Sequence, residues 1–427
     1  MSIKNTTLIW FRNDLRIHDN QALFASLEFS NCVAIYIFNE NDFIYDQDGF
    51  KKIGVFRYNF IIETLEDLKL KLSKLNVPLI ILKGNTIELL KQKIIELNVS
   101  QLYFNASPGT QEMDLEALLT TFCASNKISF KMYQTNTLIH IEDLNFTPQN
   151  FPKIFTQFRK IVESKLYIRQ EFPIPQKTNS TFFFNSFRDV NQPQKIVVQK
   201  INTEIDIKGG ETNALNRLDY YLWKSNKINT YKETRNELIG MDYSTKFSAW
   251  LAIGAISPRR IFWEIEKYEK KINKNESTYW VIFELLWRDY FNLSMILFPK
   301  AYFRFKQNES SFLDEKQKNN FLNWKFGKTG SPFVDANMKE LLNTGFMSNR
   351  GRQNVASYLI NDLKLNWQLG AKHFEEYLVD YDCASNYGNW SYLAGKGNDP
   401  RSNRYFNIEK QKQTYDPQNK YINLWNK

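Results

Sequence analysis

Cysteine and histidine are both scarce, with 3 residues of each in a chain of 427. Cys32, Cys123 and Cys383 stand far apart, with no C-x-x-C pair and no histidine at metal-ligand spacing. We therefore expect no metal site and no disulfide framework. Scattered free cysteines are typical of a reducing compartment, so we predict a cytoplasmic protein.

Long apolar runs are also missing. The N-terminal MSIKNTTLIWFRND becomes charged too early for a signal peptide. The most apolar helical stretch, YWVIFELLW, contains Glu284 and is followed directly by Arg288, so no membrane span is predicted.

Two phosphate-binding signatures are absent as well. No G-x-G-x-x-G follows the first predicted strand, which removes the usual indication of a dinucleotide site. GKTG at 327–330 is not a P-loop, because Leu322 occupies the position of the required earlier glycine.

Aromatic and basic residues are abundant. The chain has 34 Phe, 22 Tyr and 10 Trp; most are expected to fill cores, and some to line a site for a flat ligand. Lys and Arg total 56 against 46 Asp and Glu, a net charge of +10 that favours a polyanionic partner such as nucleic acid or a nucleotide.

The hydrophobic pattern divides the chain into three parts. Residues 1–140 alternate β-rich runs such as TTLIWF, NCVAIYIF, PLIILKG and SQLYFN with amphipathic helical segments, which predicts an α/β domain with a doubly wound parallel sheet. Residues 141–209 are rich in Pro, Asn, Gln and Thr and form a connection. Residues 210–427 read as helices and predict a second, all-α domain.

The segment DYSTKFSAWLAIGAIS, residues 242–257, could bind phosphate. Asp242, Ser244 and Thr245 are good helix N-caps, and Ser248 follows one turn after Ser244. Hydroxyls and free N–H groups at a helix start can hold an anion, although a cap without a ligand would look the same.

Arginines near a second helix start could bind an anion too. In GFMSNRGRQN, residues 345–354, Arg350 and Arg352 lie close to Asn349 and Gln353. Their guanidinium groups could bind a carboxylate or a phosphate, or could form a solvated basic face.

The stretch DYDCASNYGNW, residues 380–390, places Asp380 and Asp382 after an apolar helical run. The two acids could be a glycosidase pair, metal ligands, or hydrogen-bond acceptors for a buried ligand with an arginine such as Arg352 as counter-charge. Composition leaves all three interpretations open.

Six long segments together resemble the photolyase/cryptochrome family, and within it the DASH-type cryptochromes. They are WFRNDLRIHDNQAL, FTQFRKIVE, YKETRNELIGMDYSTKFSAWLAIGAISPR, ELLWRDYF, GKTGSPFVDANMKELLNTGFMSNRGRQNVASYLINDL and DYDCASNYGNWSYLAGKGNDPRSNRYFNI. The resemblance implies an α/β antenna domain followed by an all-helical domain that binds FAD in a U-shaped conformation.

The resemblance also implies a set of flavin-binding residues. The residues that resemble the family's pyrophosphate contacts are Tyr231, Ser244, Thr245 and Ser248. Those that resemble its flavin contacts are Arg288, Asn349, Asp382 and the ion pair Arg352–Asp380. Asn386 resembles the residue that faces flavin N5, where an amide can donate or accept as the flavin changes redox state.

The implied activity is repair of cyclobutane pyrimidine dimers by an electron from light-excited, reduced FAD. Glu284 and Trp287 resemble the residues that hydrogen-bond and stack on the extruded dimer. Trp390 and Trp367 resemble the inner two members of the tryptophan electron relay, but no tryptophan occurs between Trp287 and Trp324, where the surface member belongs. We expect slow photoreduction or an exit through another ring.

The implied partner is DNA, bound by a monomer. Arg235, Arg350, Arg401 and Arg404 are candidate phosphate contacts. Gln353 and Tyr392 replace larger or less polar groups of duplex-repairing relatives, so we expect repair of single-stranded or looped DNA in preference to duplex.

Alternative functions and the antenna chromophore remain open. A non-catalytic flavin photoreceptor or nucleic-acid-binding regulator is the main alternative. The animal and plant signalling cryptochromes fit less well, because they usually append a tail and we expect none after Trp425. A 6-4 photolyase would need histidines at the substrate face, and a flavin reductase would need a nicotinamide site. Ser107 stands where relatives bind a folate such as 5,10-methenyltetrahydrofolate through Glu, so tight folate binding is not expected.

Overall fold

Five parallel strands form one sheet in the order β3-β2-β1-β4-β5. The computed structural model describes residues 6–28, 31–177, 193–198, 205–303, 313–397 and 404–426. The strands are β1 (Thr6–Trp10), β2 (Cys32–Asn39), β3 (Leu79–Gly84), β4 (Val99–Asn105) and β5 (Ser129–Tyr133), and the accompanying helices are α1 (Gln21–Ser26), α2 (Val55–Lys74), α3 (Thr86–Glu96) and α4 (Thr110–Ser125). The predicted doubly wound parallel sheet is confirmed.

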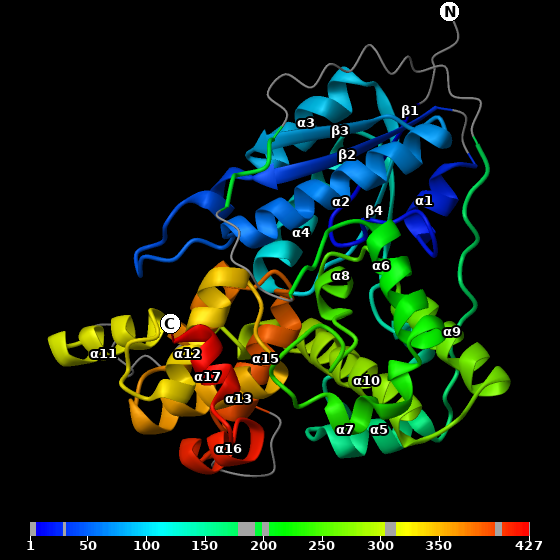
Figure 1. The fold of residues 1–427 in the computed structure, drawn as a ribbon. Helices are drawn as coiled ribbons and strands as arrows, with labels where there is room; N and C mark the ends of the chain where they lie inside the picture. The colour runs from blue at the N-terminus through cyan, green and yellow to red at the C-terminus, as the bar shows by residue number, and fades with distance from the viewer. Residues whose placement is uncertain are drawn as a thin grey trace, which may run out of the picture.

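Side chains of the central strand alternate between two cores. Leu8 and Trp10 pack with residues of α3 and α4, whereas Ile9 packs on the opposite face, in the core that contains α2. Both faces of β1 are therefore buried, as expected for a parallel strand covered by helices on both sides (Figure 1). β5 was not predicted, because its five residues are exposed or half-buried and lack the apolar run of the inner strands.

Helices make up the second half of the chain, with α5 in the predicted connection. They are α5 (Phe155–Glu163), α6 (Glu211–Asp219), α7 (Tyr231–Thr234), α8 (Ser248–Ala252), α9 (Pro258–Lys271), α10 (Glu276–Leu297), α11 (Glu315–Lys325), α12 (Pro332–Thr344), α13 (Asn349–Ser357), α14 (Trp367–Tyr377), α15 (Cys383–Leu393), α16 (Ile408–Tyr415) and α17 (Lys420–Trp425). No helix in the described part of the chain is long and apolar enough to cross a membrane. The predicted boundaries at 140 and 210 remain predictions.

The loop after β1 joins the two halves of the molecule (Figure 1). Arg16 Nη1 donates to the carbonyl oxygen of Gly254 at 2.8 Å, and Arg259 Nε donates to the carboxylate of Asp19 at 2.9 Å. Glu211, at the start of α6, accepts from the backbone N–H of His18 at 3.0 Å. The motif WFRNDLRIHDN therefore has a structural role at the junction between the sheet domain and the helical domain.

Gly254 allows the closest approach at this junction. Its φ is +66°, and a Cβ there would overlap the carbonyl oxygen of Asn13 and lie 2.6 Å from Asp14 Cα. We expect Gly254→Ala to destabilise the protein by about 3 kcal/mol or more, because backbone strain and a backbone clash add. Gly330→Ala is the control: φ is +83° but no atom lies within 4 Å, so about 1 kcal/mol is expected. If Gly254→Ala and Gly330→Ala lowered the thermal unfolding midpoint by the same amount, the predicted backbone clash at Gly254 would be contradicted.

Candidate functional site

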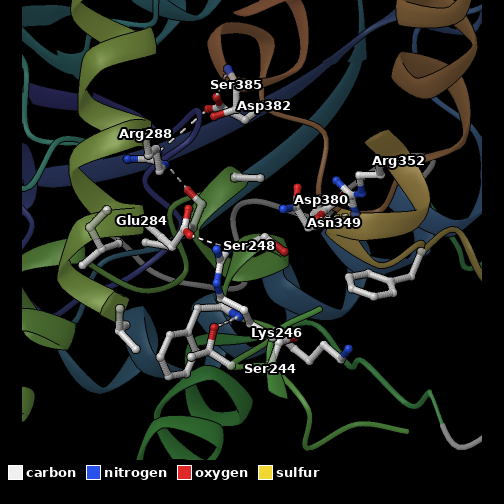
Figure 2. Close-up of a pocket in the computed structure, with 18 of the residues that line it drawn as sticks. Ser244, Lys246, Ser248, Glu284, Arg288, Asn349, Arg352, Asp380, Asp382 and Ser385 are labelled. Carbon is white, nitrogen blue, oxygen red and sulfur yellow. Dashed lines mark hydrogen bonds and ion pairs between the residues drawn. The ribbon is translucent and has the colours of Figure 1, made fainter. Parts of the chain in front are cut away.

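A large cavity opens among the helices of the second domain (Figure 2). It holds about 1120 Å³ of space, part of it open to solvent, which is enough for a cofactor-sized ligand. Nine of the ten predicted cofactor residues line it: Tyr231, Ser244, Thr245, Ser248, Arg288, Asn349, Arg352, Asp380 and Asp382. Residues separated by up to 151 positions in the sequence, from 231 to 382, are thus brought to one site.

The predicted anion cradle forms one wall of this cavity. Ser244 and Ser248 face it, and their hydroxyls make no hydrogen bond to any residue that the structure describes. Arg217 stabilises this loop by donating hydrogen bonds to the carbonyl oxygens of Ser244 and Thr245, at 3.0 and 3.1 Å. The prediction of Asp242, Ser244 and Thr245 as helix caps was wrong, because α8 begins after Phe247 and has no side-chain cap. Asp242 pairs with Arg217 Nη1 at 2.7 Å instead.

Lys246 is a cavity residue that our sequence analysis missed. Its side chain is 2% exposed, and Nζ lies 3.2 Å from the ring centre of Tyr243 without a hydrogen-bond partner in the described structure. Burial lowers the pKa of the Lys246 amine well below its usual range. A buried amine without a hydrogen-bond partner, in the same cavity wall as two free hydroxyls, suits an anionic ligand such as a phosphate. The position of Lys246 directly after Thr245 and two residues before Ser248 was the available signal.

The two acids of DYDCASNYGNW have different partners. Arg352 Nη2 donates to both carboxylate oxygens of Asp380, at 2.9 and 2.8 Å, and the Asp380 side chain is only 1% exposed. Asp382 caps α15 by accepting from the Ser385 N–H at 2.7 Å, and it lies 3.9 Å from Arg288. The described residues include no group of His, Cys, Asp or Glu that could hold a metal. Charge balance and hydrogen bonding to a ligand therefore fit these acids best.

Glu284 and Trp287 lie one turn apart on α10. Glu284 lines the cavity and accepts from Arg235 Nη1 at 2.9 Å. Burial raises the pKa of the Glu284 carboxyl, and the Arg235 charge opposes this shift. Trp287 is half-buried and lies outside the set of cavity-lining residues, stacked on Phe155.

Tyr392 meets the edge of the Trp287 indole, with ring centres 5.6 Å apart and an interplanar angle of 74°. The guanidinium of Arg404 lies 4.1 Å above the Tyr392 ring and donates to its hydroxyl. Trp287 and Tyr392 thus form an aromatic pair next to the cavity wall that contains Glu284.

The predicted DNA contacts are mostly engaged with the protein itself. Arg235 pairs with Glu284, and Arg350 donates to Asn236 at 3.1 Å while lying over the ring of Tyr415. Gln353 is half-buried on α13. Arg401 lies outside the described residues. A DNA strand would therefore compete with, or extend, these existing interactions.

Asn386 does not line the cavity, although it is buried on α15 one turn after Asp382. Its Nδ2 donates to the carbonyl oxygen of Ala371 at 3.0 Å. This hydrogen bond fixes the orientation of the Asn386 amide, and its Oδ1 remains as a hydrogen-bond acceptor.

The aromatic neighbours of Trp390 include one that we did not predict. Trp324 is fully buried and meets Trp390 edge-on, with ring centres 6.3 Å apart. Trp367 instead contacts Tyr387, at 6.4 Å. Trp390 thus has a tryptophan neighbour on α11 that its place in the sequence did not indicate.

A smaller cavity of about 600 Å³ lies at the end of the sheet, where β4 and β5 finish. Its wall includes Ser107 and Glu116. The Glu116 carboxylate is already bound by Arg12 and by the Ser107 N–H, the latter at 3.0 Å. Both hydrogen bonds go to the same carboxylate oxygen, Oε1. The antenna chromophore stays a prediction.

Comparison with known proteins gives consistent matches along the chain. Residues 7–176 match the DNA photolyase family, and residues 280–426 match the FAD binding domain of DNA photolyase. Cryptochrome DASH of Xenopus laevis is 42% identical over 425 residues, covering 97% of this chain and 81% of the relative. Cryptochrome DASH of Arabidopsis thaliana, named as chloroplastic/mitochondrial, is 41% identical over 99% of this chain and 75% of the relative.

Solved structures agree with these matches. The crystal structure of the cryptochrome from Synechocystis sp. PCC6803 superposes with a TM-score of 0.92 at 40% identity, over 100% of this chain and 89% of that chain. An archaeal photolyase from Sulfolobus tokodaii, solved with two FAD molecules, has a TM-score of 0.78 at 26% identity, covering 98% and 90%. The chain therefore belongs to the photolyase/cryptochrome family, in its cryptochrome DASH group.

Proposed function

We propose that this protein repairs cyclobutane pyrimidine dimers in single-stranded or looped DNA, using blue light and FAD. Its FAD-binding domain contains a cavity whose groups suit the cofactor: the free hydroxyls of Ser244 and Ser248 and the unpartnered amine of Lys246 for the phosphates, and Asp382 and Arg288 for the flavin ring. When bound and reduced, FAD supplies the light-driven electron that splits the dimer and then takes it back.

The residues of the chain bind and orient the substrate. Trp287 and Tyr392 offer aromatic surface on which an extruded dimer stacks, in place of the neighbours that it loses on leaving the strand. The Glu284 carboxyl lines the cavity, where it would accept a hydrogen bond from an N–H on the polar edge of a pyrimidine. Arg235 holds this carboxyl in place.

One observation carries the proposal: Glu284 and Trp287 lie one turn apart on α10, so a carboxyl inside the cavity and an indole beside it share a rigid support. A dimer stacked on Trp287 would then lie next to the cofactor cavity. Short-range electron transfer requires this proximity, and no general base is needed.

The test is repair of a defined lesion. Photoreduced protein is incubated with a thymine dimer in a single-stranded oligonucleotide and in the matching duplex, under blue light and in darkness. We expect light-dependent repair of the single strand at least about 10-fold faster than of the duplex, because opening a duplex costs a few kcal/mol that the smaller Tyr392 ring offsets less well. Comparable rates on the two substrates would contradict the single-strand preference.

A non-catalytic flavin photoreceptor is the second candidate. The ion pair between Arg235 and Glu284 favours it, because the carboxyl assigned to the dimer already has a partner. Absence of light-dependent repair on both substrates would select this function.

A further inference from the structure

Phe155, the first residue of α5, forms a close parallel stack with Trp287. The ring centres are 3.7 Å apart and the planes differ by 14°. The other rings near Trp287 are more distant and more inclined: Phe291 lies at 5.4 Å and 31°, and Tyr392 at 5.6 Å and 74°. One face of the indole is therefore covered by a parallel ring.

Phe155 is itself held firmly. It is 4% exposed and lies edge-on to Phe283 at 5.2 Å and to Tyr290 at 5.8 Å. The hydroxyl of Tyr290 donates to the carbonyl oxygen of Pro152 at 3.2 Å, which ties the start of α5 to α10. The connection between the domains thus contributes a rigid wall against Trp287.

A tryptophan on which a base stacks binds that base more tightly when a neighbouring ring fixes its rotamer beforehand. A half-buried indole on a helix can adopt several rotamers, and each base that stacks on it must first select one. A ring stacked behind the indole selects that rotamer in advance and leaves the opposite face for a single base. The binding free energy then loses less to side-chain ordering.

We infer that Phe155 is a positioning residue for dimer recognition: it fixes the Trp287 indole so that one face alone is offered to an extruded pyrimidine. The inference rests on the proposed function, because it takes Trp287 as the stacking surface. It assigns part of the substrate site to the connection rather than to the helical domain.

The test compares two substitutions on the same helix. Phe155→Leu removes the stacked ring, whereas Phe158→Leu removes a neighbouring ring that is 0% exposed and packs on Tyr290 and Phe155, away from the indole. Dissociation constants of the FAD-loaded proteins are measured in darkness for a single-stranded oligonucleotide with one thymine dimer and for the undamaged oligonucleotide. Aromatic pairs contribute about 0.5–1.5 kcal/mol, so Phe155→Leu is expected to weaken dimer binding about 2- to 12-fold and to leave undamaged binding unchanged.

A second measurement reports on the indole without substrate. In protein labelled with fluorotryptophan, the ¹⁹F resonance that disappears in Trp287→Phe is expected to shift in Phe155→Leu, through loss of the ring current, and to stay in Phe158→Leu. Phe155→Tyr keeps the ring and is expected to restore dimer binding.

The outcomes separate this inference from the proposed function. If the wild type prefers the dimer but Phe155→Leu and Phe158→Leu bind it equally, the positioning role is wrong while the repair proposal stands. If the wild type binds damaged and undamaged strands alike, the repair proposal fails first.

Discussion

Replacing Asp380 by asparagine is expected to leave the purified protein with little FAD. The Asp380 carboxylate accepts two hydrogen bonds from Arg352 and is almost fully buried, and both residues line the cavity. An amide keeps the shape but loses the charge and places an N–H₂ group against the guanidinium. Breaking a buried pair costs about 3–5 kcal/mol, so Arg352 would leave its place in the wall.

We expect FAD affinity to fall about 100-fold or more, since each 1.4 kcal/mol is a factor of about 10. The ratio of flavin to protein absorbance after purification, and titration of the apoprotein with FAD, measure this. Asp143→Asn is the control: Arg169 also donates two hydrogen bonds to Asp143, from Nε and Nη2 at 2.8 Å each, but at the surface. Normal FAD content in Asp380→Asn would remove Asp380 from the site.

Replacing Trp287 by alanine is expected to abolish the preference for damaged DNA. Stacking of one base on an aromatic ring contributes about 1–3 kcal/mol, which corresponds to a loss of about 5- to 150-fold in dimer affinity. Undamaged single strands should bind as before, because phosphate contacts hold them. Dark fluorescence anisotropy with both oligonucleotides measures the two affinities.

Trp263→Ala serves as the control for this substitution. Trp263 is also half-buried on a helix of the same domain, but its indole N–H donates to the carbonyl oxygen of Arg169, away from the cavity. The Trp263→Ala substitution should reduce the stability of the protein without changing its preference for damaged DNA. A Trp287→Ala protein that lost affinity for damaged and undamaged strands equally would show that the indole supports the fold rather than the lesion.

Local patterns were sufficient to predict the architecture. Inner strands such as β1 are apolar on both faces, and this pattern by itself indicates a parallel sheet covered by helices. The same reasoning missed β5, because an exposed edge strand carries little hydrophobic signal. The family resemblance supplied ten predicted cofactor residues, and nine of them line one cavity.

Contacts between distant residues could not be read from order along the chain. Asp242 suits a helix cap by residue type, yet the packing of α6 brings Arg217 to it instead. Trp324 reaches Trp390 only because the fold brings α11 and α15 together, and Phe155 reaches Trp287 across 132 positions.

Residue types and their local periodicity are properties of the chain, so the fold class follows from them directly. The neighbour that a side chain contacts in the folded protein does not follow from the sequence in this way. A carboxylate or a ring contacts whichever neighbour the packed helices bring within a few ångströms, and only the tertiary structure brings Arg217 to Asp242 and Phe155 to Trp287.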